Sequence, residues 1–225
     1  MTAEPLSPGR TAAWALAVLV VVGAVNTLVQ VALAAPAGPA GLRDDATLFS
    51  LGLILGSLAG SALLLWILRA REPRRDLALT APRLVHFALW IVITAITIYV
   101  TGALGVLLGH PAVPTAWQTT FDNASSPRLL AFALVVVAPL FEEGYFRGFL
   151  HRGLAASRLG PTGAVLLIAV LFTLVHFPED LWTATLGLVN ALLLGLARVH
   201  TGSIVPGIAI HALLNATILV QLALA

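Results

Sequence analysis

Long apolar runs, separated by short polar or Pro- and Gly-rich segments, follow one another along the whole chain. Seven runs predict helices, at roughly 11–35, 47–69, 84–109, 128–154, 161–177, 182–198 and 203–222. A helix needs about 20 apolar residues to cross a hydrocarbon core about 30 Å thick. The pattern therefore predicts an all-α, polytopic transmembrane bundle of about seven spans, with residues 1–225 forming a single integral membrane domain.

The composition agrees with this prediction and excludes several functions. The chain is 59% hydrophobic and 10% charged, whereas a soluble domain carries about 25% charged residues. The net charge is only +2 and the arginines are spread over short loops, so no nucleic-acid partner is expected. The chain has no cysteine, which excludes thiolate catalysis, and no lysine, which excludes a Schiff base.

The positions of the arginines predict an orientation in the cell membrane. Lys and Arg near span ends concentrate on the cytoplasmic side. With the N-terminus in the cytoplasm, the following arginines fall on that side: Arg10, Arg69, Arg71, Arg74, Arg75, Arg83, Arg147, Arg152, Arg158 and Arg198. Only Arg43 and Arg128 fall outside. A multi-pass chain with its N-terminus inside and its C-terminus outside is expected.

Three charged residues interrupt the fourth run, in the stretch "APLFEEGYFRGFL". Charges near the middle of a bilayer usually face the bundle interior and mark a functional site. Glu143 and Arg147 are spaced i,i+4 and can pair on one helix face. Glu142 is about 100° away around the helix and has no such partner. An unpaired carboxylate in an apolar pocket is a candidate general base.

Two later runs carry polar residues at the same spacing. Phe172 and His176 lie in "FTLVH", and His211 and Asn215 lie in "HALLN". Each histidine alone could simply bond to a neighbouring helix. Together with Glu142, however, two imidazoles and an amide on separate helices can activate a water molecule and stabilise an oxyanion.

The sequence lacks the motifs that other hydrolytic mechanisms require. The sequence contains no "HExxH", no "GxSxG" and no pair of aspartates within the spans. A Glu/His site that uses water remains. The alternative is a non-proteolytic membrane protein, either a proton-coupled transporter or a scaffold that sequesters peptides. No repeat symmetry supports a transporter.

The ordered motifs EExxxR, FxxxH and HxxxN resemble those of the CPBP (ABI) family of intramembrane proteases. This family includes type II CAAX prenyl endopeptidases and bacterial proteins linked to bacteriocin immunity and peptide processing. The motifs cover residues 128–225, whereas residues 1–127 show none. The resemblance implies a membrane-embedded endopeptidase whose substrate is a peptide, prenylated or of the leader or bacteriocin type.

The resemblance also implies roles for single residues. Glu142 and His176 would activate the water, and His211 and Asn215 would stabilise the oxyanion. Glu143 and Arg147 would hold the shape of the site. The cofactor is either absent or a divalent metal: Glu142, His176 and His211 form an acceptable zinc set, although a metal would occupy the carboxylate needed as base.

The expected depths of these residues disagree. At 1.5 Å per residue, Glu142 and His211 lie roughly 10 Å from the cytoplasmic face, whereas His176 lies about 22 Å from Pro161. If the three converge, the fifth helix must be tilted or must start deeper in the membrane, or the fourth helix must be displaced. An active site facing the cytoplasmic side is expected.

Overall fold

The computed structural model describes residues 6–34, 46–111 and 113–224, and these residues form helices without any strand. The helices are α1 (Pro8–Ala34), α2 (Ala46–Ile67), α3 (Pro73–Asp76), α4 (Leu84–Leu107), α5 (Thr115–Asp122), α6 (Pro127–Phe132), α7 (Ala138–Glu142), α8 (His151–Ala155), α9 (Gly160–Val175), α10 (Leu181–Thr201) and α11 (Val205–Leu224), with π-helical segments η2 (Ala133–Val137) and η3 (Glu143–Leu150). The elements from α6 to α8 form one continuous helix, Pro127–Ala155.

The structure confirms an all-α bundle with about seven passes. Within the described ranges 6–34, 46–111 and 113–224, six helices are long and apolar enough to cross a membrane. The seventh, α9, has 16 residues, so its length is about 24 Å at 1.5 Å per residue. Because the hydrocarbon core is about 30 Å thick, α9 is too short to cross it upright.

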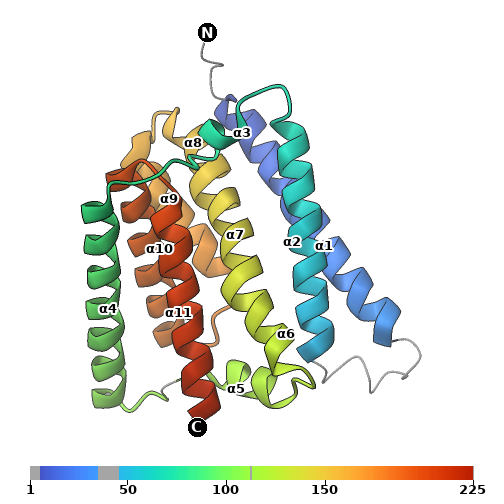
Figure 1. Ribbon diagram of the computed structural model, residues 1–225, viewed down its shortest axis with the longest axis vertical. Helices are drawn as coiled ribbons and strands as arrows, with labels where there is room; N and C mark the ends of the chain where they lie inside the picture. Colours follow the sequence, from blue (N-terminus) through green and yellow to red (C-terminus); the bar gives the residue numbers. More distant parts are fainter. Residues whose placement is uncertain (1–5, 35–45, 112, 225) are drawn as a thin grey trace.

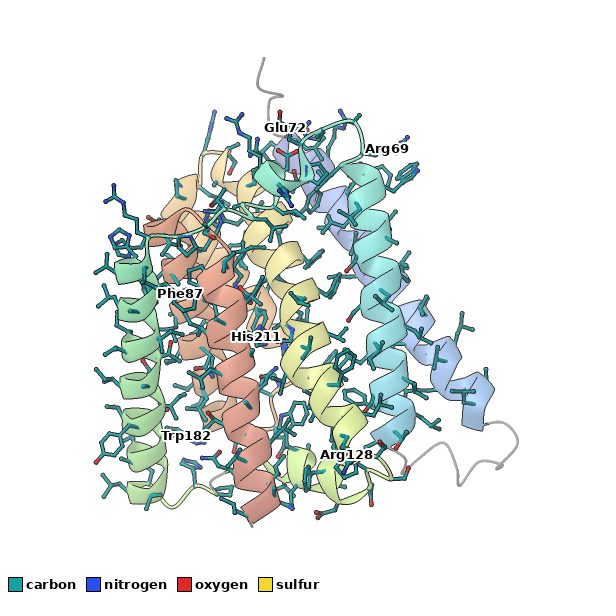
Figure 2. The ribbon with its side chains drawn as sticks, in the orientation of Figure 1. Arg69, Glu72, Phe87, Arg128, Trp182 and His211 are labelled. Atoms are coloured by element: carbon teal, nitrogen blue, oxygen red, sulfur yellow. The ribbon has the colours of Figure 1, made fainter. Side chains whose placement is uncertain are left out.

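The bundle has two ends, which we name by the short helices that lie there. Figure 1 shows α3 and α8 at the end where α1 begins, and α5 at the end where α11 stops. These ends are the α3 face and the α5 face. Figure 2 shows Arg69 and Glu72 at the α3 face, and Arg128 and Trp182 toward the α5 face.

Small residues let α1 and α2 pack closely. A Cβ atom added at Gly56 would lie 2.8 Å from the backbone oxygen of Val22, and one added at Gly60 would lie 2.5 Å from a methyl group of Val22. Helices in membranes associate by such close approach because lipid supplies no hydrophobic drive between them. Phe141 also approaches Gly60, so the α1–α2 pair packs against the helix that carries the three charges.

A segment that we call the strap, residues 71–80, lies across the α3 face. Asp76 forms ion pairs with Arg71 and Arg152 at 2.7 and 3.0 Å. The Ile204 backbone N–H donates to the Ala78 carbonyl at 3.1 Å. The strap thereby ties α8 to the connection between α10 and α11.

Two further contacts, one made by Ser203 and one made by Leu77, hold the strap against the bundle. The Ser203 hydroxyl donates to the Thr80 carbonyl at 2.5 Å. Leu77 lies so near the η3 backbone that a Cβ atom at Gly148 would be 3.0 Å from the Leu77 carbonyl oxygen. The α3 face is therefore covered by backbone that is bonded to the bundle.

The α1–α2 contact generates a test of stability. Gly56→Ala should lower the free energy of unfolding in detergent by about 1–3 kcal/mol, because the new methyl group meets the Val22 backbone. Gly23→Ala is the matched control, since nothing lies within 4 Å of its Cβ position. Thermal unfolding of both variants checks the prediction, and equal midpoints would contradict it.

Candidate active site

A fully buried ion pair lies at the centre of the bundle. Arg147 Nη1 lies 3.0 Å from Glu143 Oε1, and the two side chains are 1% and 0% exposed. The pair has the i,i+4 spacing expected from the sequence. Because the two residues lie about one helical turn apart on η3, the helix itself brings the charges together.

Arg147 also connects three helices. Its Nη2 donates to the Ala191 carbonyl of α10 at 3.1 Å, and its guanidinium carbon lies 4.4 Å from the centre of the Phe172 ring of α9. A guanidinium over an aromatic face is stabilised further when it is desolvated. The buried cation is therefore held by a carboxylate, a carbonyl and a ring.

His211 is bound to the same carboxylate. Its Nδ1 lies 3.0 Å from Glu143 Oε1, the oxygen that also accepts from Arg147. A carboxylate oxygen that already accepts a hydrogen bond from a guanidinium also acts as the acceptor toward the imidazole. Nδ1 of His211 therefore carries the proton, which leaves Nε2 unprotonated in the neutral ring.

His176 has the same tautomer for a different reason. It is the residue directly after α9, and its Nδ1 lies 2.7 Å from the Phe172 carbonyl. Since a carbonyl only accepts, Nδ1 is the donor and Nε2 of the neutral ring has a free lone pair. The Phe172 ring lies 4.3 Å from the His176 ring and 5.8 Å from the His211 ring, centre to centre, so Phe172 separates and orients both imidazoles.

Glu142 faces these two histidines. Its Oε2 lies 3.7 Å from Nε2 of His176 and 3.8 Å from Nε2 of His211. Both distances are too long for direct hydrogen bonds, and Oε2 is buried without a hydrogen-bond partner. Three acceptors therefore converge on a point where a donor is missing.

The position of Asn215 depends on a proline in the facing helix. In η2 the Ala138 N–H donates to the Ala133 carbonyl, five residues earlier. In the same register, the N–H of residue 139 would donate to the Leu134 carbonyl. Residue 139 is proline, however, and has no N–H. Asn215 Nδ2 donates to the Leu134 carbonyl at 2.7 Å instead. The proline thus creates an open carbonyl, and that carbonyl anchors the Asn215 amide.

A cavity of about 640 Å³ extends from the histidines toward the α5 face. His176, His211 and Asn215 line it. Its other walls come from α4, α5, α10 and the connections beside them, and include Asn190. Glu142 is not among the lining residues, and its side chain is 16% exposed while that of His176 is 43% exposed. The imidazole of His176 therefore forms part of the boundary between the cavity and Glu142.

Two contacts join the elements around the far end of the cavity. His110 stacks on Trp182 at 4.7 Å between ring centres, and the Ala116 N–H donates to Glu179 Oε1 at 2.7 Å. Asp180, the N-cap residue of α10, accepts hydrogen bonds from the backbone and hydroxyl of Thr183. The backbone bond, followed by the hydroxyl bond, lowers the pKa of Asp180, so this end stays acidic.

The residues proposed from the sequence as zinc ligands do not form a metal site of the usual kind. Within residues 6–34, 46–111 and 113–224, no group of three His, Asp or Glu side chains is arranged to hold a metal ion. The Nε2 atoms of His176 and His211 and the Glu142 carboxylate suit zinc in chemical type, and chelation of the active protein decides between a glutamate and a metal mechanism.

The structure brings together all six residues that the sequence singled out: Glu142, Glu143, Arg147, His176, His211 and Asn215. The discrepancy in depth disappears because α9 ends inside the bundle, beside Glu142. Sequence reasoning missed the bond between His211 and Glu143, and the anchoring of Asn215 by Leu134. The proline at position 139, in mid-helix, was the signal available for the second.

The buried ion pair generates a prediction that separates charge from packing. Arg147→Met should lower the free energy of unfolding by about 3–5 kcal/mol, because it leaves the Glu143 carboxylate buried and unpaired. The double variant Glu143→Leu/Arg147→Met should recover most of that loss, since no charge is then left buried. Unfolding in detergent measures both. If the double variant were less stable than Arg147→Met, the unpaired Glu143 carboxylate would not be the cause of the lost stability.

Comparison with known proteins agrees with this arrangement. Residues 124–217 match the family described as type II CAAX prenyl endopeptidase Rce1-like. No curated protein and no solved structure shows significant similarity to the chain. The matched segment contains every residue of the converging cluster, and the resemblance drawn from the three motifs is confirmed. Through residues 124–217, which carry this site, the chain is similar to the Rce1-like family of CAAX-type membrane proteases.

Proposed function

We propose that the chain is an intramembrane endopeptidase that hydrolyses a peptide bond with a water molecule activated by Glu142 and His176. The observation that carries this proposal is the position of Glu142 Oε2, which is buried without a hydrogen-bond partner and faces Nε2 of His176 and Nε2 of His211. A water molecule there can donate to Oε2 and to one Nε2. It is then polarised by two bases while its oxygen lone pairs remain free.

The same groups account for a balanced hydrolysis. The water oxygen attacks the carbonyl carbon of the substrate as Glu142 takes the water proton. The tetrahedral intermediate then collapses, the C–N bond breaks, and the departing nitrogen receives that proton. The products are a carboxylic acid and an amine. General acid–base transfer of this kind contributes about 10²–10⁴-fold to a rate.

His211 and Asn215 are the proposed donors to the oxyanion. Nδ1 of His211 already donates to Glu143, so His211 can donate through Nε2 only as an imidazolium, which takes its second proton from solvent before the reaction and keeps it throughout. The adjacent Glu143 carboxylate stabilises that cation. Asn215 has two amide hydrogens, and the Leu134 carbonyl uses one of them. The second is available to the oxyanion, and such a donor contributes about 10²–10³-fold.

Glu143 and Arg147 are proposed as positioning residues. Neither lines the cavity, and both are buried behind the histidines. Their role is to hold the His211 ring and its tautomer. The proposed substrates are peptides of the CAAX or leader type, in keeping with the family.

The first test of this function removes the base without changing its shape. Glu142→Gln should reduce peptide cleavage by at least about 100-fold while leaving the unfolding midpoint nearly unchanged, because the amide cannot take the water proton. Glu72→Gln, an exposed residue of the α3 face, is the matched control and should retain activity. Cleavage of a peptide library by purified protein measures both. A Glu142→Gln variant with full activity would sink the proposal.

A second test concerns the metal. Because no three-ligand group is arranged to hold an ion among the described residues, cleavage should survive dialysis against a chelator. Elemental analysis of the same active sample should find substoichiometric zinc. Loss of activity on chelation, restored by added zinc, would contradict the metal-free step and assign a ligand role to the histidines.

A further inference from the structure

Positive charge gathers at the α3 face of the bundle. It comes from five segments: the start of α1, the connection after α2, the strap, the residue before α4, and the connection between α8 and α9 (Figure 1). The exposed arginines of these segments, which we call the basic patch, are Arg10, Arg69, Arg74, Arg75, Arg83 and Arg158. Among the described residues of this face, Glu72 has the only exposed carboxylate. This end of the molecule therefore carries a large excess of positive charge.

The second carboxylate of this face is already neutralised. Asp76 is buried, and its two oxygens pair with Arg71 at 2.7 Å and with Arg152 at 3.0 Å. Its neighbours on the strap, Arg74 and Arg75, have no such partner: neither side chain forms a hydrogen bond, ion pair or ring contact within the described part of the chain. Like charges without counterions repel one another and destabilise the compact state. The patch therefore gains from an external anion.

The basic patch lies at the level where the bundle meets lipid headgroups. The Arg69 guanidinium carbon lies 4.0 Å from the centre of the Trp66 ring, and Arg69 Nη1 donates to the Trp66 carbonyl at 2.7 Å. Trp66 is half exposed and contacts Trp14 edge-on, with the ring centres 6.0 Å apart. Tryptophan at span ends lies at headgroup level. Leu84, directly after Arg83, is 80% exposed and begins the apolar surface of α4.

An anionic lipid surface fits the patch better than a single soluble anion. The small pocket at this face, lined by Arg71 and Arg152, has a volume of about 10 Å³, which is room for one water molecule. A phosphate ion therefore finds no enclosed site there. Several headgroups of one leaflet, by contrast, can meet arginines on all five segments at once. Each arginine near an anionic membrane surface adds to the attraction.

We propose that the basic patch binds the headgroups of anionic phospholipids, above all through Arg74 and Arg75, and that this binding holds the strap on the bundle. Leu77, two residues after Arg75, lies against Gly148 of η3. Gly148 directly follows Arg147 of the buried ion pair. A headgroup bound at the strap is therefore one packing contact away from the helix that carries the candidate site. The proposal names a lipid partner and does not depend on proteolysis.

Unfolding of the purified protein in mixed micelles tests the proposal. Phosphatidylglycerol should raise the unfolding midpoint as its fraction in the micelle rises, because a ligand of the folded state stabilises that state. Phosphatidylcholine carries the same phosphate without a net charge and should raise the midpoint much less. Salt should remove the difference, since exposed charges are screened beyond about 10 Å at 0.1 M. Equal shifts with the two lipids, or a difference that salt leaves unchanged, would overturn the proposal.

Variants locate the response on the strap. Arg74→Gln should weaken the apparent affinity for phosphatidylglycerol about fivefold, and Arg74→Gln/Arg75→Gln about 25-fold. Arg74→Lys/Arg75→Lys keeps the charge and should retain most of the affinity. Arg128→Gln is the matched control, because Arg128 is exposed but lies toward the α5 face (Figure 2). A glutamine double variant that binds as tightly as Arg128→Gln contradicts the proposal, and the salt test on the unaltered protein needs no variant.

Two soluble ligands distinguish the sources of negative charge. Inorganic phosphate supplies the same anion without a lipid surface, and a short single-stranded oligonucleotide supplies a soluble polyanion. Neither should raise the midpoint as phosphatidylglycerol does, because only a lipid surface brings several headgroups beside the apolar spans. A shift as large with either ligand would overturn the lipid assignment. All of these measurements follow unfolding and not cleavage, so the lipid proposal and the proposed function can fail separately.

Discussion

The buried contact between Glu143 and Arg147 is the constraint on which the rest of the site depends. Two charges with almost no exposure are tolerated only when each has further partners. Arg147 finds them on α9 and α10, and Glu143 finds one in His211 of α11. Satisfying one ion pair therefore fixes the relative positions of four helices. It also fixes the tautomer of a histidine that the proposed chemistry needs.

A local defect in the backbone of η2 positions Asn215 in a similar way. The five-residue register of η2 and the missing N–H of Pro139 leave the Leu134 carbonyl without a backbone donor. In a bilayer such a carbonyl must be satisfied within the protein. Asn215 of α11 donates this hydrogen bond. The carbonyl that η2 leaves without a backbone donor is therefore satisfied by a side chain that also lines the cavity. Widened helical turns are frequent at functional sites, and here the reason is visible.

Much of this arrangement follows from spacing alone. The i,i+4 separation of Glu143 and Arg147 predicted their pairing, and the 100° offset of Glu142 predicted a carboxylate that faces elsewhere. The spans were predictable because a bilayer demands long apolar runs. Contacts between helices were not: nothing in the sequence around His211 indicates that its Nδ1 reaches Glu143 rather than Glu142. The division of the chain into residues 1–127 and 128–225 stays a prediction, although the Tyr145 hydroxyl donates to the Ala15 carbonyl and so joins the two parts.

The short length of α9 connects the chemistry to the position of the cavity. With 16 residues, α9 stops before it could cross the bilayer, and His176 lies directly after its last turn. A full-length helix would have carried that residue past Glu142 and filled the space below it with apolar side chains. Because α9 stops early, the chain turns back through residues 177–180, and this turn borders the cavity. The same shortening that aligns His176 with Glu142 therefore leaves space for the cavity beside residues 177–179, so the proposed catalytic geometry and the position of the cavity both follow from one helix length.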